Sequence, residues 1–160
     1  MSDALVLRAD VSGVCTLTLN RPDKRNAINR DLFREFRAHV RDIEEGVGDA
    51  GLVVITGAGE HFCAGHDLKS PPHADALGWL RQEMLIVERL TRLRQPVIAK
   101  IRGTCYTGGL ELALAADFIV CGESARFADT HGKWGLVPGW GLSQRLPRRV
   151  GQAKALEMML

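Results

Sequence analysis

One carboxylate, Glu111, lies inside the apolar run of the stretch CYTGGLELALAAD at residues 105–117. The run predicts a short helix that is apolar on all sides, which is typical of a buried helix. A carboxylate in a low-dielectric environment has a raised pKa and is a candidate general acid or base. The alternative is that Glu111 complements the helix dipole at a solvated surface. The leucines and alanines around it leave no polar face for it to join, which favours the catalytic interpretation.

Two glycines, Gly108 and Gly109, directly precede this helix. Their backbone amides are the unsatisfied donors at the positive end of the helix dipole, a place that favours negative charge. The alternative is that both glycines only permit a tight turn. A second loop, FCAGHDLK at residues 62–69, follows a predicted buried strand and exposes further amides. Two amides that converge from these loops would each stabilise an oxyanion by roughly 3 kcal/mol.

Length and composition indicate a single globular domain, since the 160 residues are 46% hydrophobic and 25% charged. The net charge of +2, without a run of five basic residues, does not favour nucleic acid as the main partner. Four cysteines stand singly, without metal-site or redox spacing, so we expect reduced thiols and a cytoplasmic location. We expect neither a secretory leader nor a membrane span.

Strand-like and helix-like segments alternate along the chain, which predicts an α/β layer architecture. The predicted strands are residues 4–8, 14–19, 52–56, 97–101 and 118–121, the last three of them buried, and the predicted helices lie around residues 32–43, 76–94, 110–116 and 152–160. Asn29 or Asp31 is expected to cap the first helix. The long helix is expected to bury its periodic apolar residues, which are Leu77, Leu80, Met84, Val87 and Leu90.

Five segments carry a family resemblance, and they are NRPDKRNAIN, VVITGAGEHFCAGHDLK, QPVIAKIRGTCYTGGLELALAADFIV, ARFADTHGKWGLVPGWGLSQRLPRRVG and AKALEMML. In this order they resemble the enoyl-CoA hydratase/isomerase (crotonase) family over nearly the whole chain. The resemblance implies a spiral of ββα turns and a homotrimer or a dimer of trimers. It makes residues 1–160 a single crotonase-like core domain, without the family's C-terminal helical region. In the family, that region and the loop around residues 70–80 govern substrate choice.

The resemblance assigns the binding residues to the two loops. It places the oxyanion-hole amides at His66 and Gly108, although the family usually has a small residue at the first position. The simplest interpretation of the His66 side chain is that of a solvated loop histidine. Asp67, Leu68 and Lys69 match the coenzyme A site.

Lys69 can face a phosphate as a point charge. Arg25, with Lys24 beside it in the early loop, is a weaker candidate for the same task, because exposed cationic side chains usually serve solubility.

Glu111 matches the first of the two catalytic glutamates of the hydratases, whereas His131 stands where the second is expected and Thr130 replaces the preceding proline. A histidine can accept or donate a proton near neutral pH. It can take over the second role, or it can mark a different reaction or a poor catalyst. Asp129 is interpreted as an exposed loop acid. Gly139 stands where the dehalogenases of the family have a nucleophilic aspartate, which excludes that chemistry.

The resemblance therefore predicts an enoyl-CoA hydratase that adds water to a 2-enoyl-CoA through an enolate, with Glu111 and His131 as catalytic residues. The alternatives are another acyl-CoA reaction of the family, an isomerase or lyase, and a weakly catalytic acyl-CoA-binding protein. A serine hydrolase of the related ClpP type is disfavoured because Glu111 stands where its nucleophile is needed. No metal or redox cofactor is expected, since coenzyme A is part of the substrate.

Overall fold

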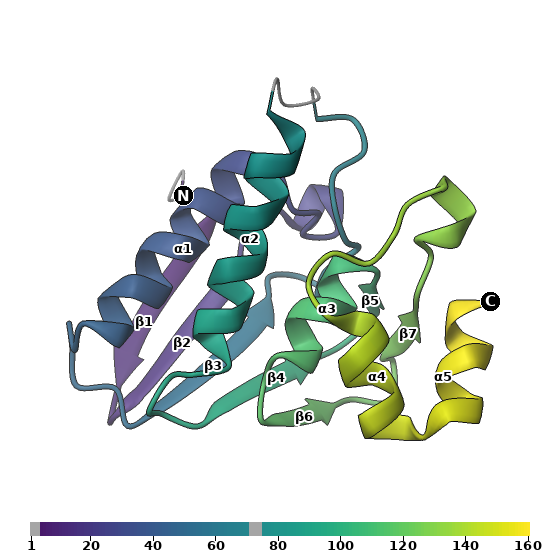
Figure 1. The fold of residues 1–160 in the computed structure, drawn as a ribbon. Coiled ribbons are helices and arrows are strands. Elements are labelled where there is room, and N and C mark those ends of the chain that lie inside the picture. Colours follow the sequence, from purple (N-terminus) through teal and green to yellow (C-terminus); the bar gives the residue numbers. More distant parts are fainter. Residues whose placement is uncertain (1–3, 71–74) are drawn as a thin grey trace.

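The computed structural model describes residues 4–70 and 75–160, which form a twisted sheet covered by helices (Figure 1). The strands are β1 (Val6–Val11), β2 (Val14–Leu19), β3 (Leu52–Gly57), β4 (Val97–Ile101), β5 (Thr104–Tyr106), β6 (Phe118–Cys121) and β7 (Arg126–Ala128). The helices are α1 (Arg30–Glu44), α2 (Ala76–Leu90), α3 (Gly108–Leu114), α4 (Leu142–Val150) and α5 (Gln152–Met159), with short 3₁₀ turns η1 (Pro22–Lys24) and η2 (Gly132–Trp134). None of the helices in this part of the chain is long and apolar enough to cross a membrane.

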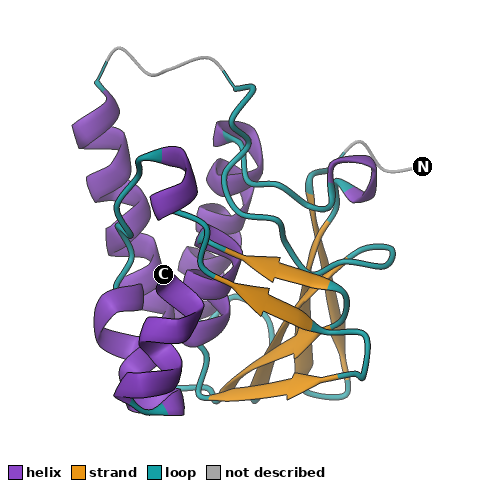
Figure 2. Cartoon of the chain, turned by 90° about the vertical axis from the view of Figure 1, so that its right-hand side faces the viewer, coloured by secondary structure: helices purple, strands orange, loops and turns teal. Residues whose placement is uncertain are grey.

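The main sheet has the strand order β1-β2-β3-β4-β6. The first two strands form an antiparallel hairpin, and each later strand pairs in parallel with its neighbour. Every second residue of β2 and β3 is buried, because side chains alternate between the faces of a strand. The buried side chains meet α1 and α2, which lie side by side against this face, and Figure 2 shows the longer helices gathered on one side of the strands.

The chain order repeats a strand–strand–helix unit, as the family resemblance predicted, except that the single strand β3 precedes α2. A second, smaller sheet pairs β5 with β7 in parallel. Two isolated parallel bridges join Ile28 to His66 and Cys63 to Cys105. These bridges place the 62–69 loop beside β5, and α3 begins two residues after the end of that strand. Two segments that are about 40 residues apart in sequence therefore meet where the site is expected.

The first helix is capped as expected, since the Asn29 side chain accepts a hydrogen bond from the amide of Leu32 at 2.9 Å. The buried face of α2 differs from the prediction. Glu83, Ile86, Val87 and Leu90 are buried, whereas Leu77 is 82% exposed.

Leu80 and Met84 are also exposed. Apolarity alone does not distinguish core residues from those that line a cavity, and Leu80 lies on the wall of the cavity described below.

The prediction that residues 118–121 form a buried strand was wrong in its burial. The strand exists as β6, but Phe118 is 61% exposed and Val120 is 57% exposed. The reason is its position at the edge of the sheet, where it pairs only with β4. All four cysteines carry free thiols.

Candidate active site

A cavity of about 330 Å³ lies between α2, the 62–69 loop, the start of α3 and the loop before α4. Its ionisable lining residues include His66, Glu83, Glu111 and His131. Apolar side chains, such as those of Leu80 and Val137, supply the rest of the wall. A cavity of this size with a few convergent polar groups is the usual form of a small-molecule site.

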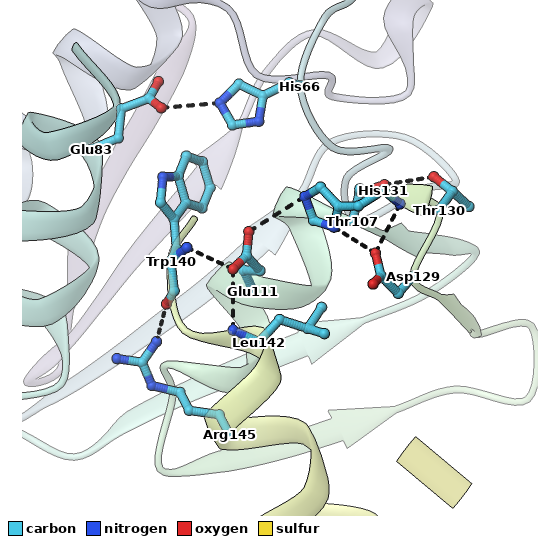
Figure 3. Close-up of polar contacts among 10 residues, drawn as sticks. All are labelled: His66, Glu83, Thr107, Glu111, Asp129, Thr130, His131, Trp140, Leu142 and Arg145. Carbon is cyan, nitrogen blue, oxygen red and sulfur yellow. Dashed lines mark hydrogen bonds and ion pairs between the residues drawn. The ribbon is translucent and has the colours of Figure 1, made fainter. Parts of the chain in front are cut away.

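The Glu111 carboxylate is buried, as predicted, with 1% of the residue exposed. Its Oε1 atom accepts hydrogen bonds from the amides of Trp140 at 2.7 Å and Leu142 at 3.2 Å (Figure 3). The Arg145 side chain donates to the carbonyl of Trp140 and so fixes this turn at the start of α4. Burial raises the pKa of Glu111 above its ordinary value, although the two amide hydrogen bonds oppose that rise.

His131 lies beside Glu111, with 3.7 Å between its Nε2 atom and the Glu111 Oε2 atom. Asp129 Oδ1 accepts hydrogen bonds from the Nδ1 atom of His131 at 2.5 Å and from its amide at 3.0 Å (Figure 3). Because a carboxylate only accepts, Nδ1 carries the proton and Nε2 faces Glu111. The interpretation of Asp129 as an exposed loop acid was wrong, since its side chain is only 4% exposed. The turn folds it back onto His131.

The two predicted oxyanion-hole residues, His66 and Gly108, lie next to each other. A Cβ atom placed on Gly108 would lie 3.2 Å from His66 Nδ1. The Ile28 amide donates a hydrogen bond to the carbonyl of Gly65, and the Ile28 carbonyl accepts one from the amide of Asp67. The amide of His66, which lies between these two residues, therefore points away from Ile28. Gly108 is the first residue of α3, and backbone N–H groups in the first turn of a helix lack a partner within the helix. Their role as an oxyanion hole stays a prediction.

Backbone strain marks the residue before α3. Thr107 has φ 51° and ψ −118°, a left-handed conformation that costs energy for a side chain with a branched Cβ. Its amide donates to the Ala128 carbonyl at 3.0 Å, and its hydroxyl contacts that of Thr130 at 2.9 Å. Gly109 serves close packing, since a Cβ atom there would lie 2.6 Å from the Cys63 carbonyl oxygen. The strained turn thus seats α3 firmly against the 62–69 loop.

The His66 side chain is not a free loop histidine, contrary to the simplest interpretation. Its Nε2 atom lies 3.1 Å from Glu83 Oε2, and its ring packs on the ring of Trp140 with centroids 4.7 Å apart. Sequence reasoning missed Glu83. The signal was present, because Glu83 lies three and four residues before Ile86 and Val87 on the buried stripe of α2.

Three of the residues predicted to bind coenzyme A, which are Asp67, Leu68 and Lys69, follow His66 in the same loop, and Arg25 lies in the early loop. Asp67 pairs with Arg21 at 2.9 Å. Burial opposes its charge, but the hydrogen bonds from Arg21 and the Lys69 amide outweigh that effect and hold the pKa of Asp67 below its ordinary value. Asp67 therefore braces the loop. Leu68, Lys69 and Arg25 are exposed, and their contact with coenzyme A stays a prediction.

Comparison of the sequence with known proteins identifies related enzymes. The family model described as enoyl-CoA hydratase/isomerase matches residues 10–160. The chain is 35% identical to probable enoyl-CoA hydratase 1, peroxisomal, of Arabidopsis thaliana, an alignment that covers 96% of this chain and 58% of that protein. It is also 35% identical to 1,2-epoxyphenylacetyl-CoA isomerase of Escherichia coli (strain K12), over 92% of this chain and 59% of that protein.

Solved structures give the same result. The crystal structure of an enoyl-CoA hydratase from Mycobacterium avium superposes with a TM-score of 0.82 at 44% identity, covering 97% of this chain and 63% of that one. The enoyl-CoA hydratase from Bacillus anthracis superposes with a TM-score of 0.89 at 34% identity, over 97% of this chain and 62% of that one. The chain thus spans about three-fifths of the length of these relatives, and it belongs to the enoyl-CoA hydratase/isomerase (crotonase) family and has the crotonase fold.

Proposed function

We propose that this protein is an enoyl-CoA hydratase, which adds water across the double bond of a 2-enoyl-CoA. The observation that carries the proposal is the buried Glu111 carboxylate, held by two amides beside an imidazole that Asp129 orients. Such a pair of groups with different environments can divide the roles of base and acid. His66 lines the cavity beside these groups, and Gly108 lies next to it, since a Cβ atom placed on Gly108 would lie 3.2 Å from His66 Nδ1.

Each of these groups has its own role in the proposed reaction. The thioester oxygen accepts hydrogen bonds from the amides of His66 and Gly108, which stabilise the enolate as it forms. Glu111 takes a proton from water as its oxygen bonds to C3, and the imidazolium of His131 gives a proton to C2. Transfer of the proton from Glu111 to His131 then restores the starting state. The gap of 3.7 Å between Glu111 Oε2 and His131 Nε2 exceeds a hydrogen bond, so one water molecule can contact both groups.

A second candidate is an acyl-CoA isomerase of the same family. The relative from Escherichia coli named as an isomerase supports it, since that protein shares 35% identity with this chain. The same two groups could move one proton between two carbons of an acyl chain. An isomerase requires no added water, which separates the two reactions experimentally.

Purified protein incubated with crotonyl-CoA tests the proposal. We expect loss of the conjugated thioester absorbance and formation of 3-hydroxybutyryl-CoA, with one oxygen from labelled water in the product. Conversion of a 3-enoyl-CoA to a 2-enoyl-CoA without label would support the isomerase instead. No turnover of short, medium or branched enoyl-CoAs would contradict both and leave an acyl-CoA-binding protein.

Three further points belong to the proposal. We expect a homotrimer or a dimer of trimers, which light scattering would detect. We expect activity without a metal or redox cofactor, so treatment with a chelator should leave the rate unchanged. We expect a cytoplasmic location, which fluorescent tagging would test. All three rest on the sequence and its family resemblance.

A further inference from the structure

A second imidazole–carboxylate pair, His66 with Glu83, faces the cavity from the side of α2 (Figure 3). The proposed addition of water does not use the His66 ring. We infer that this pair binds a hydroxyl group on the acyl chain of the substrate, so that the preferred substrate is a hydroxylated 2-enoyl-CoA. This inference rests on the proposed function for the reaction, although not for the binding.

Glu83 is built into the wall as a fixed acceptor. Its side chain is 3% exposed. Its Oε1 atom accepts a hydrogen bond from the Trp79 indole at 2.7 Å, and its Oε2 atom lies 3.1 Å from His66 Nε2. Because a carboxylate only accepts, Nε2 of His66 carries a proton. The ring is also held against Trp140, so its orientation is set from two sides.

The other ring nitrogen of His66, Nδ1, is the group left for a ligand. In the part of the chain that the structure describes, no hydrogen-bond partner is found for it, and it lies beside the start of α3, 3.2 Å from a Cβ atom placed on Gly108. Neutral imidazole would present a lone pair there, and imidazolium would present an N–H group. A hydroxyl group can donate to the first and accept from the second, so it fits both states without a further charge.

A plain hydrocarbon chain does not fit this wall as well. The His66 side chain is 37% exposed, so a bound acyl group would remove Nδ1 from water. A polar group buried without a partner opposes binding, whereas a hydroxyl placed there restores the lost hydrogen bond. Since the His66 amide is proposed to hold the thioester oxygen, the hydroxyl is expected within a few carbons of the thioester, for example on C4.

Turnover of hex-2-enoyl-CoA and of 4-hydroxyhex-2-enoyl-CoA tests the inference. We expect wild type to prefer the hydroxylated substrate by about tenfold or more in kcat/KM, the value of one hydrogen bond in a desolvated site. His66→Phe keeps the backbone amide and a ring against Trp140 but removes both nitrogens, and it should bring the preference close to one. Glu83→Gln should reduce the preference in part.

The matched control is Glu88→Gln, on the same helix. Glu88 pairs with Arg92 on the exposed side, away from the cavity, so this variant should keep the full preference of wild type. Circular dichroism of each variant would confirm that it is folded. Because preference is a ratio within one protein, a variant with a lower overall rate still gives an answer.

Binding of the saturated analogues separates this inference from the proposed reaction. Calorimetry with hexanoyl-CoA and 4-hydroxyhexanoyl-CoA requires no turnover, and we expect about tenfold tighter binding of the hydroxylated compound to wild type but not to His66→Phe. Absence of hydration together with this difference would overturn only the hydratase proposal. Equal affinities in wild type, or a preference unchanged in His66→Phe, would overturn the inference.

Discussion

The two walls of the cavity each hold a histidine through a carboxylate, but they do so over very different distances in the sequence. On the α3 side, Asp129 binds both the ring and the amide of His131, two residues away. On the α2 side, Glu83 reaches His66 from 17 residues away. The His131 side chain is 7% exposed and that of His66 is 37% exposed.

This difference separates two tasks. The contact between Asp129 and His131 lies within one turn of the chain, so it keeps its geometry whenever that turn is folded. Such a contact suits proton transfer, in which small displacements lower the rate strongly. The contact between His66 and Glu83 depends on the docking of α2, which places the His66 ring on the wall that a bound acyl group would contact. We therefore propose that Glu111 and His131 transfer protons and that His66 and Glu83 select the substrate. The predictions below test this division.

Replacement of Glu111 should have the largest effect. Glu111→Gln can keep the acceptor for the amides of Trp140 and Leu142 but cannot take a proton, so we expect kcat to fall about a thousandfold with little change in acyl-CoA affinity. Steady-state hydration rates and calorimetry measure the two quantities. Glu157→Gln is the matched control at an exposed site and should behave as wild type. A similar loss in the control would point to an unspecific effect.

Truncation of the histidine beside it should come next. His131→Ala removes the group proposed to donate a proton to C2, and we expect kcat to fall about a hundredfold while the KM for crotonyl-CoA changes little. Rapid-mixing kinetics would measure the chemical step directly. A rate equal to that of wild type would show that His131 is a bystander and would remove the α3 wall from its proposed role as a proton relay.

Asp129 is a positioning residue, so its replacement should cost less. Asp129→Asn keeps the shape of the side chain but loses the charge beside the imidazole, and we expect about a tenfold loss in kcat. The KM for crotonyl-CoA should change little, because Asp129 contacts His131 rather than the cavity. A purely structural role would instead raise KM together with the loss in kcat. Asp23→Asn, at an exposed site, is the control.

The smallest effect concerns stability. Burial raises the pKa of Glu111 in the folded protein, so the folded state binds its proton more tightly than the unfolded chain does. The wild-type protein therefore loses stability as pH rises from about 4 through the folded pKa, whereas Glu111→Gln does not titrate there. We expect the free energy of unfolding of the variant to rise relative to that of wild type between acid and neutral pH in urea unfolding. A constant difference across this range would contradict a raised pKa.

Local patterns in the sequence predicted most elements of the fold and the burial of Glu111. Period-two alternation predicted β2 and β3, and the apolar surroundings of Glu111 left it no solvated face. These features depend on neighbours within a few residues, so the chain carries them without knowledge of its partners. The strand β6 was predicted, but its exposure was not, since an apolar run gives no information about what packs against it.

The sequence by itself determined which residues could do chemistry, namely an acid before an apolar run, glycines at a helix start and histidines in two loops. Only the tertiary structure decided their pairing. Asp129 turns inward onto His131, and Glu83 meets His66 because α2 docks over the 62–69 loop. The physical reason is that burial follows from local composition, whereas the partner of a buried charge is chosen by the packing of elements that are distant in the chain.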